Sequence, residues 1–583
     1  MNTGRLIGLV ALATSGQLTA QLPPLPRAGA APIQLSGELG SFGELYRRTG
    51  APGRRPGETG RVYLNANAVL FGSLRLGVDV IASTEDGTSL GYGGLPGRQS
   101  ISQFGLHPQW RWGRAHLGSF TDGYSALTYN AIQLRGASVD LQPGRLRLGA
   151  FGGRASSAVF GGATNGAYKR TVAGGRLGFG RQEIGQASTF IELTALRAWD
   201  DPNSLPAIDT TLPPNAPTAG GLTLVNPYAV TPEENLVVAA AGGATFLRGK
   251  LAWRGELAGA VHTRDVRASE LDDTAADVPG VLRGLITPRV GTHADVAFSS
   301  DLQLRQLRLP GATTGSQRTL TASLGYRHVG PGYTSLGAVS VGNDVQALDA
   351  RANIRFSRWS AQLQAGTQND NLAGQKLSTT VRQRLGGAFS MRLSRVWNAS
   401  LRASLMTMGN GSADTLQWMD YSAWSFGMGH GFSFGPRRRV ESLSIDYSYQ
   451  KSGDANPLRA GAGFAAQSLN ARLSVRVSPV VQFSPTLGLT RSQSDTLVPV
   501  TRATYGVSAA WRLWGGRLTT TGSVGRSKYA SSNSWTSTLG SRLHLTAQDD
   551  LLLNFQVNRF ADTVVPDRGF NEQTLTLRWV RRL

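Results

Sequence analysis

The feature that most constrains this chain is a strict alternation of apolar and polar residues along short segments. From Leu469 to Val477, leucine, alanine and valine occupy the odd positions, and asparagine, serine and arginine occupy the even ones. Successive side chains of a β-strand point to opposite faces of a sheet. One face of this segment is therefore apolar and the other carries arginine, which predicts a strand that separates an apolar environment from a wet one.

The same alternation recurs along almost the whole chain, and helical periodicity is nearly absent. Clear examples lie at 62–70, 74–80, 348–356, 443–449 and 503–513. The pattern predicts about 26 strands of roughly 10 to 15 residues each. They start near Ile33 and continue to the C-terminus.

The connections between these segments alternate in length. Short ones read "FGS" at Phe71, "QPG" at Gln142, "RGK" at Arg248, "SRW" at Ser357, "SRVW" at Ser394, "SPV" at Ser478, "WGG" at Trp514 and "AQDD" at Ala547. Longer connections rich in Gly, Pro and Asp cover 47–60, 84–100, 200–233, 263–287, 329–344, 408–417 and 561–570. This order is typical of an up-and-down barrel with short periplasmic turns and long outer loops, and a Greek-key sandwich gives no reason for it.

The overall composition permits either a membrane protein or a secreted all-β protein. Hydrophobic residues make up 40% of the 583 residues, and no stretch beyond the N-terminus is apolar enough for a membrane-spanning helix. A sheet that crosses a bilayer has to close, because its backbone groups find no partners in lipid. The sequence therefore predicts an all-β fold, a transmembrane up-and-down antiparallel β-barrel of about 26 strands within a range of roughly 22 to 28.

The two ends of the chain agree with export to an outer membrane. Residues 1–20 have a positive start at Arg5, an apolar run and a small residue at Ala20, which predicts a signal peptide; a short buried helix is the alternative. A short Pro-rich periplasmic segment at 21–32 and a barrel at 33–583 follow. The chain has no cysteine, so it offers neither a lipoprotein anchor nor a disulfide. The final "QTLTLRWVRRL" predicts a last strand, although the usual terminal aromatic residue is replaced by Leu583.

Two longer stretches carry a resemblance beyond the general pattern. They begin "FGLHPQWRWGRAHLGSF" at Phe104 and "YRHVGPGYTSLGAVSVG" at Tyr326. Both are similar to segments of large, mostly uncharacterised outer-membrane β-barrel proteins of Gram-negative-type bacteria, over about a sixth of the chain. The resemblance implies a fold and a location, and it implies no substrate and no functional residues.

The net charge of +22 comes from 59 basic residues, of which only five are lysine. These charges recur at alternate positions and form no patch or tail, so we expect no nucleic-acid partner. Ten arginines on the polar side of their strands are candidates for a lumen-lining, anion-facing wall: Arg351, Arg355, Arg382, Arg384, Arg392, Arg402, Arg472, Arg476, Arg512 and Arg542. Two alternatives are that they pair with carboxylates such as Asp349 and Asp446 or solvate a wide interior, and an arginine-rich genome explains part of the bias.

No motif predicts catalysis, a cofactor or a metal. The seven histidines are scattered, with no pair at ligand spacing along one strand: His107, His116, His262, His293, His328, His430 and His544. "GAGFAA" at Gly461 lacks the strand–helix context of a dinucleotide site, and we interpret it as a loop that enters a strand. Acidic residues at 270–277 (Glu270, Asp272, Asp273 and Asp277) predict a solvated outer loop, because they lack the ligand spacing of a calcium loop. The alternative is a divalent cation shared with lipopolysaccharide phosphates. We expect no enzyme and no cofactor.

The predicted lumen is wider than that of porins of 16 to 18 strands, so something should fill it. The segment before the first strand is too short to be a plug domain, which leaves the loops 200–233 and 263–287 or a separate plug or periplasmic partner protein. One hypothesis is a channel or translocation pore for bulky or anionic material. The alternative is a plugged scaffold subunit of a secretion or surface-assembly complex. The other expected partners are outer-membrane lipid and lipopolysaccharide.

Overall fold

The structure is a computed structural model that describes residues 33–84, 102–159, 167–181, 189–205, 216–217, 223–224, 230–271, 285–309, 318–435, 439–459, 461–529 and 531–583. The predicted signal peptide at 1–20 and the segment at 21–32 lie outside the described residues. Most of the predicted loop 200–233 and the second half of the loop 263–287 also lie outside them.

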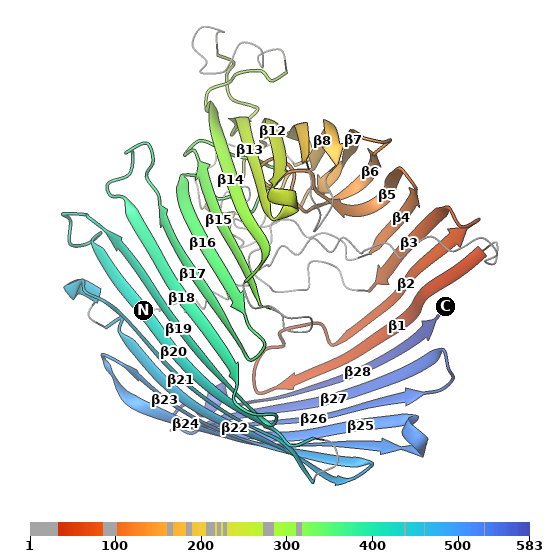
Figure 1. Ribbon diagram of the computed structural model, residues 1–583, viewed down its shortest axis with the longest axis vertical. Coiled ribbons are helices and arrows are strands. Elements are labelled where there is room, and N and C mark those ends of the chain that lie inside the picture. Colours follow the sequence, from red (N-terminus) through yellow and green to blue (C-terminus); the bar gives the residue numbers. More distant parts are fainter. Residues whose placement is uncertain are drawn as a thin grey trace.

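Twenty-six strands form one antiparallel sheet in which each strand pairs with its neighbours in sequence. The first strand also pairs with the last, with Phe42 opposite Arg578, so the sheet closes into a barrel (Figure 1). The prediction of an all-β antiparallel barrel of about 26 strands is confirmed. No helix among the described residues is long and apolar enough to cross a membrane.

The strands up to the first third of the barrel are β1 (Ile33–Thr49), β2 (Glu58–Leu70), β3 (Leu74–Ser83), β4 (Gln103–Trp110), β5 (Gly113–Asp122), β6 (Ile132–Leu141), β7 (Leu146–Ser156), β8 (Arg170–Arg181) and β9 (Thr189–Asp200). Outside the barrel sheet, two strands of two residues each, β10 (Ala216–Pro217) and β11 (Thr223–Leu224), pair with each other. The barrel continues with β12 (Glu234–Phe246), β13 (Leu251–Thr263), β14 (Thr292–Arg308), β15 (Thr319–Val329), β16 (Val345–Arg355), β17 (Trp359–Asn369), β18 (Thr380–Arg392) and β19 (Trp397–Asn410).

The remaining strands are β20 (Met419–Ser433), β21 (Val440–Asp454), β22 (Phe464–Ser478), β23 (Val481–Ser494), β24 (Leu497–Leu513), β25 (Leu518–Lys528), β26 (Ser532–His544), β27 (Asp549–Asp562) and β28 (Phe570–Arg582). Among the described residues, short 3-10 helices lie between strands: η1 (Leu247–Gly249), η3 (Pro457–Arg459), η4 (Trp514–Gly516) and η5 (Pro566–Arg568).

The eight short connections predicted from the sequence all fall between consecutive strands at one end of the barrel. Tight turns there use left-handed backbone at Phe71 and Gly72, and again at Trp514 and Gly515. The first long connection is shorter than predicted, at 50–57 instead of 47–60, because β1 continues to Thr49 along β28 and β2 already begins at Glu58, opposite Leu45. The glycines of "GAGFAA" precede β22, as the interpretation of this motif required.

The two faces of the barrel wall differ in chemistry. Residues directly opposite one another in a ladder share a face, so the register assigns every strand residue to one side. Large apolar side chains such as Leu193, Leu363 and Leu385 are each more than half exposed and lie on one face. The other face carries charged, amide and hydroxyl side chains, as in the row that joins Asp349, Gly366 and Arg384. An exposed apolar band around a closed sheet is typical of a barrel that faces lipid.

Candidate functional site

Two connections at the end opposite the short turns fold back against the polar face. Residues 123–131 join β5 to β6, and residues 330–344 join β15 to β16. Six strand spacings of about 4.8 Å separate β5 from β13 along the sheet. The first loop nevertheless contacts Glu256 on β13 through Ser125 and Leu127. A loop of this length can make that contact only by crossing the concave side, so the polar face lines the interior of the barrel.

The two inward loops are bound to each other. The Tyr333 hydroxyl donates to the Leu127 carbonyl at 2.9 Å, and the Ser335 hydroxyl donates to the Thr128 carbonyl at 2.7 Å. The backbone N–H of Asn130 donates to the Gly337 carbonyl at 2.9 Å. Because these bonds join residues some 200 positions apart in the sequence, they fix the two loops as one unit.

The unit is also bonded to the wall. The Glu256 carboxylate accepts from the Ser125 hydroxyl and from the Leu127 backbone N–H. The Asn235 side chain on β12 donates to the Thr334 carbonyl at 2.9 Å and accepts from the Leu336 N–H at 3.0 Å. Both Asn235 and Glu256 are buried, and a buried polar group has to be hydrogen-bonded to be tolerated. The wall therefore holds the loops through hydrogen bonds of buried side chains.

Apolar packing completes the contact between the loops and the wall. The Tyr129 ring stacks on Phe151 of β7 with ring centroids 3.9 Å apart. Leu196 and Val237 form part of the same buried cluster. Gly337 passes so close that an added Cβ would overlap the Leu196 side chain, so only glycine fits there. Burial raises the pKa of Tyr129 far above its ordinary value, which keeps its hydroxyl neutral.

Charges of opposite sign are paired below the inward loops, on the inner face of β5 to β9. Arg176 contacts Asp140 and lies 3.6 Å from Glu192, and Arg147 lies 3.0 Å from the same Glu192 carboxylate. Arg114 joins the network at 3.3 Å from Asp140. Buried charges persist only when they are paired in this way. We call the inner face of β5–β9 and β12–β15, with the two loops on it, the loop-covered arc.

All ten predicted arginines lie on the inner face of β16–β26, which we call the open arc. The register places Arg351 opposite Gln364, Arg402 opposite Ala388, and Arg472 opposite Thr486. Nine of the ten are exposed and Arg476 is half-buried. That these arginines attract anions in the lumen stays a prediction.

The ten arginines divide according to their partners. Arg384 contacts Asp349, Arg476 lies 2.5 Å from Glu441, and Arg542 lies 2.5 Å from Asp550. The other seven have no carboxylate within 4.0 Å among the described residues: Arg351, Arg355, Arg382, Arg392, Arg402, Arg472 and Arg512. Pairing with Asp349 thus applies to one arginine. Asp446 instead lies with Arg472 around a hollow of about 250 Å³.

The register also brings together histidines that are far apart in the sequence. The Nδ1 atoms of His107 and His116 are 2.6 Å apart on β4 and β5, and His262 lies opposite His293 on β13 and β14. Each pair joins two neighbouring strands, so no spacing along a single strand indicates it. Across the ranges that the structure describes, no group of three or more His, Asp or Glu side chains is placed to hold a metal.

The acidic outer segment at 270–277 is described only at its start. There the Glu270 carboxylate accepts a hydrogen bond of 2.9 Å from Arg289. Asp272, Asp273 and Asp277 lie outside the described residues.

Comparison of the whole fold with solved structures finds outer-membrane β-barrels. The P pilus usher (PapC) translocation pore is 12% identical, with 94% of this chain and 100% of that chain covered at a TM-score of 0.35. The siderophore receptor PirA from Pseudomonas aeruginosa is 10% identical, with 94% and 80% covered at 0.38. The anion-selective porin from Comamonas acidovorans is 11% identical, with 50% and 91% covered at 0.24.

No protein-family model matches this sequence, and the comparison with curated proteins likewise finds no match. The similarity to the solved barrels is too distant to carry a function. The membership of an uncharacterised family, which two segments of the sequence predicted, stays a prediction.

Proposed function

We propose that this protein is an outer-membrane channel or translocation pore for bulky or anionic material. The observation that carries the proposal is a set of seven arginines on the inner face of the open arc that have no acidic partner among the residues the structure describes. A wall that carries charge of one sign attracts counter-ions and raises their local concentration. Neutral hydrogen-bonding side chains lie between them, such as Asn470 and Thr504 on either side of Gly488. Such a surface is wetted by water.

The loop-covered arc supports the same proposal from the opposite side. Its network of Arg114, Arg147, Arg176, Asp140 and Glu192 is paired and mostly buried, so this network contributes little potential to the lumen. The two inward loops occupy interior space with elements of the chain itself. They are not the loops 200–233 and 263–287, and that those loops or a separate protein also fill the lumen stays a prediction. A separate plug or periplasmic partner remains part of the proposal, as do lipid and lipopolysaccharide around the exterior.

The test is the reversal potential of the purified protein in a planar bilayer under a salt gradient. We expect anion preference that is mild and fades as salt rises, because exposed charges are screened beyond about 8–10 Å at physiological ionic strength and beyond about 3 Å at 1 M. Arg472→Gln should shift the reversal potential toward cations at low salt. Cation preference in the unmodified protein would overturn the anion pathway.

A paired site in the same arc supplies the control. The double change Arg476→Gln with Glu441→Gln removes one charge of each sign, so the reversal potential should stay within the scatter of the unmodified protein. The alternative function, a scaffold closed by another chain, predicts a different result. A correctly folded barrel that stays electrically silent at all voltages would favour it.

A further inference from the structure

The weakest seam in the barrel lies between β4 and β5. Its two strands pair at only four positions, whereas every other seam of the described sheet pairs at seven or more. Near the outer end, pairing stops at Gly105 opposite Gly118. Beyond that point β4 continues on β3, with Gln103 opposite Ile81, and β5 continues on β6 as far as Asp122. The ladder between β4 and β5 is therefore open there.

Local backbone geometry explains why the ladder opens. Gly118 has a φ of +92°, a left-handed conformation that side-chain-bearing residues rarely adopt. An added Cβ at Gly118 would collide with the Phe104 carbonyl. The Arg135 guanidinium on β6 reaches across β5 and donates to the Ser102 carbonyl at 2.8 Å. At this place a flexible side chain bridges the gap between β4 and β6, whereas along the rest of the sheet backbone hydrogen bonds join neighbouring strands.

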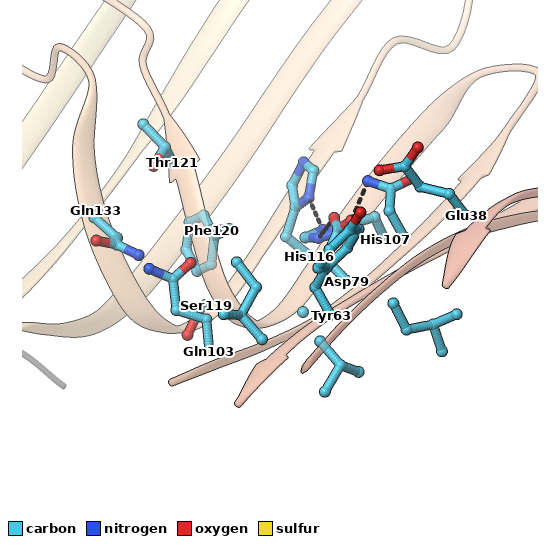
Figure 2. Close-up of a pocket in the computed structure, with 15 residues that line it drawn as sticks. Glu38, Tyr63, Asp79, Gln103, His107, His116, Ser119, Phe120, Thr121 and Gln133 are labelled. Carbon is cyan, nitrogen blue, oxygen red and sulfur yellow. Dashed lines mark hydrogen bonds and ion pairs between the residues drawn. The ribbon is translucent and has the colours of Figure 1, made fainter. Parts of the chain in front are cut away.

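A cavity of about 550 Å³ lies at this open seam (Figure 2). Its residues come from both faces of the wall. Phe120 and His116 belong to the inner face, whereas Thr121 and Gln133 lie opposite each other on the outward face. On the outside, Phe104 and Leu117 next to the seam are each about half exposed. The cavity is therefore placed between the lumen and the lipid-facing surface.

The lumenal side of the cavity is a connected set of polar groups. His107 Nε2 lies 3.1 Å from Asp79, which also accepts a bond from the Asn65 amide, and His107 Nδ1 faces His116 Nδ1 (Figure 2). A carboxylate accepts, so a neutral His107 carries its proton on Nε2 and accepts at Nδ1 from His116. The His116 Nε2 atom then presents a lone pair. This leaves an uncharged imidazole acceptor in the cavity.

The carboxylates at the cavity already have partners. Glu38 lies 3.3 Å from Arg578, which also donates to the Tyr63 hydroxyl at 2.6 Å, and Asp79 is held by His107 and Asn65. An anionic headgroup would meet these two carboxylates at close range and be repelled. A hydroxyl group, which both donates and accepts, matches the amide, phenol and imidazole groups instead.

We propose that the β4–β5 seam binds an amphipathic molecule with an uncharged, hydroxyl-bearing headgroup and lets it pass between the lumen and the bilayer. The headgroup contacts Asn65, Tyr63 and His116, and the apolar chain lies along Phe120 and leaves beside Phe104. The cavity volume lies within the range of small-molecule sites, about 300–1,000 Å³. The inference goes beyond the proposed function and does not depend on the arginines of the open arc.

Photolabelling in lipid nanodiscs tests the inference. The probe is an alkyl glucoside with a diazirine in its alkyl chain, and a fatty acid with the same chain and diazirine is the comparison. After illumination, mass spectrometry of peptides should place most glucoside adducts within 103–122, with several-fold fewer adducts from the fatty acid. Adducts spread evenly around the barrel would overturn the proposal.

The second experiment closes the β4–β5 seam with a disulfide. Because the chain has no native cysteine, an engineered pair can bond only with itself. Phe104→Cys with Ser119→Cys continues the register beyond Gly105 and Gly118, so its disulfide should reduce labelling at least fivefold, with recovery in reductant. Leu106→Cys with Leu117→Cys links a position that is already paired and should leave labelling unchanged. Equal labelling in the variants with the 104–119 and the 106–117 disulfide would contradict the proposal.

A third variant provides a test in case the disulfide between positions 104 and 119 does not form. Asn65→Leu removes one polar group that contacts the headgroup, and Asp79→Leu removes the carboxylate that orients Asn65 and His107. Labelling by the glucoside should fall at least fivefold. The barrel should still migrate differently before and after heating in gel electrophoresis, which shows that it is folded. Unchanged labelling would contradict the proposal. Conductance measured on the same protein keeps this result separate from the anion pathway, because the open arc is not altered.

Discussion

The loop-covered arc and the open arc are parts of one sheet with the same outer face, yet their inner faces are built by opposite rules. In the loop-covered arc Arg147, Arg176 and Glu192 are almost fully buried and paired. In the open arc Arg351 and Arg472 are exposed and have no carboxylate within ion-pair distance among the described residues. The first arrangement resembles the core of a soluble protein, and the second resembles the wall of an aqueous channel.

The difference shows where the barrel obtains rigidity and where it keeps a free surface. Burial makes each polar group of the loop-covered arc costly to disturb, because a lost partner leaves a desolvated charge behind. Exposure makes each arginine of the open arc nearly independent of its neighbours. We therefore expect substitutions in the first arc to act on stability and loop position, and substitutions in the second to act on ion selectivity.

The largest expected effect comes from a buried arginine. Arg176→Ala removes the guanidinium that contacts Asp140 and the second cation beside Glu192 in a desolvated site. Loss of one partner of a buried pair costs about 3–5 kcal/mol. Arg472→Ala, the same change on the open arc, should cost less than about 1 kcal/mol. The measurement is urea unfolding of the barrel in lipid vesicles. Equal costs for the two variants would remove the distinction between the arcs.

The outer face should not distinguish the arcs. Leu193 on β9 and Leu473 on β22 both lie on the apolar face near the middle of their strands. Replacement of either by Arg should cost roughly 2–4 kcal/mol, as charge does near the bilayer midplane. Arg472→Leu, one residue from Leu473 and on the inner face, should be much milder. The same unfolding assay checks all three, and a mild Leu193→Arg would mean that the loop-covered arc is not in contact with lipid.

The sequence predicted the features that repeat along it. Strand number, short turns and the placement of Arg351 and Arg472 on one face all follow from a period of two, since each depends on residues within one strand or one hairpin. No long-range contact is needed to assign Leu473 and Arg472 to opposite sides.

The features that the sequence did not predict depend on contacts between distant segments. Nothing in residues 123–131 indicates that Ser125 will contact Glu256, which is 131 positions away. In the sequence, Tyr129 cannot be told from any other aromatic residue of a loop, and Gly337 cannot be told from an ordinary turn residue. The His107–His116 contact likewise requires the register of β4 on β5. A signal was present in Asn235 and Glu256, polar residues within otherwise apolar and small segments, because such residues need partners.

A smaller effect is expected when one tether of the inward loops is removed. Asn235→Ala leaves the Leu336 N–H and the Thr334 carbonyl without their bonds to the wall, at a cost of about 1–3 kcal/mol. The loops should then move more often, which single-channel recordings would register as more frequent current fluctuations. Asn470→Ala is the matched change on the open arc and should leave the current trace as steady as before. Identical noise in both variants would show that the loops do not border the conducting path.

The smallest expected effect is a pH dependence where the inward loop meets the open arc. The carboxylate of Asp344, at the end of 330–344, accepts hydrogen bonds from the backbone N–H of Asn371 and Leu372 and lies 2.5 Å from the Lys376 ammonium. Burial acts to raise the pKa of Asp344, but these bonds outweigh it and hold the pKa below its ordinary value.

A lowered pKa in the folded state means that the contact contributes fully above the unfolded pKa of about 3.9 and weakens as the pH falls through the folded value. Current fluctuations should therefore be constant from pH 8 to pH 5 and rise only below about pH 4. Asp344→Asn should show raised fluctuations already at pH 7 and lose this pH dependence, because an amide cannot take up the proton. A rise that begins near pH 6 instead would point to a histidine, and the Asp344 contact would then not be the group that steadies the loop.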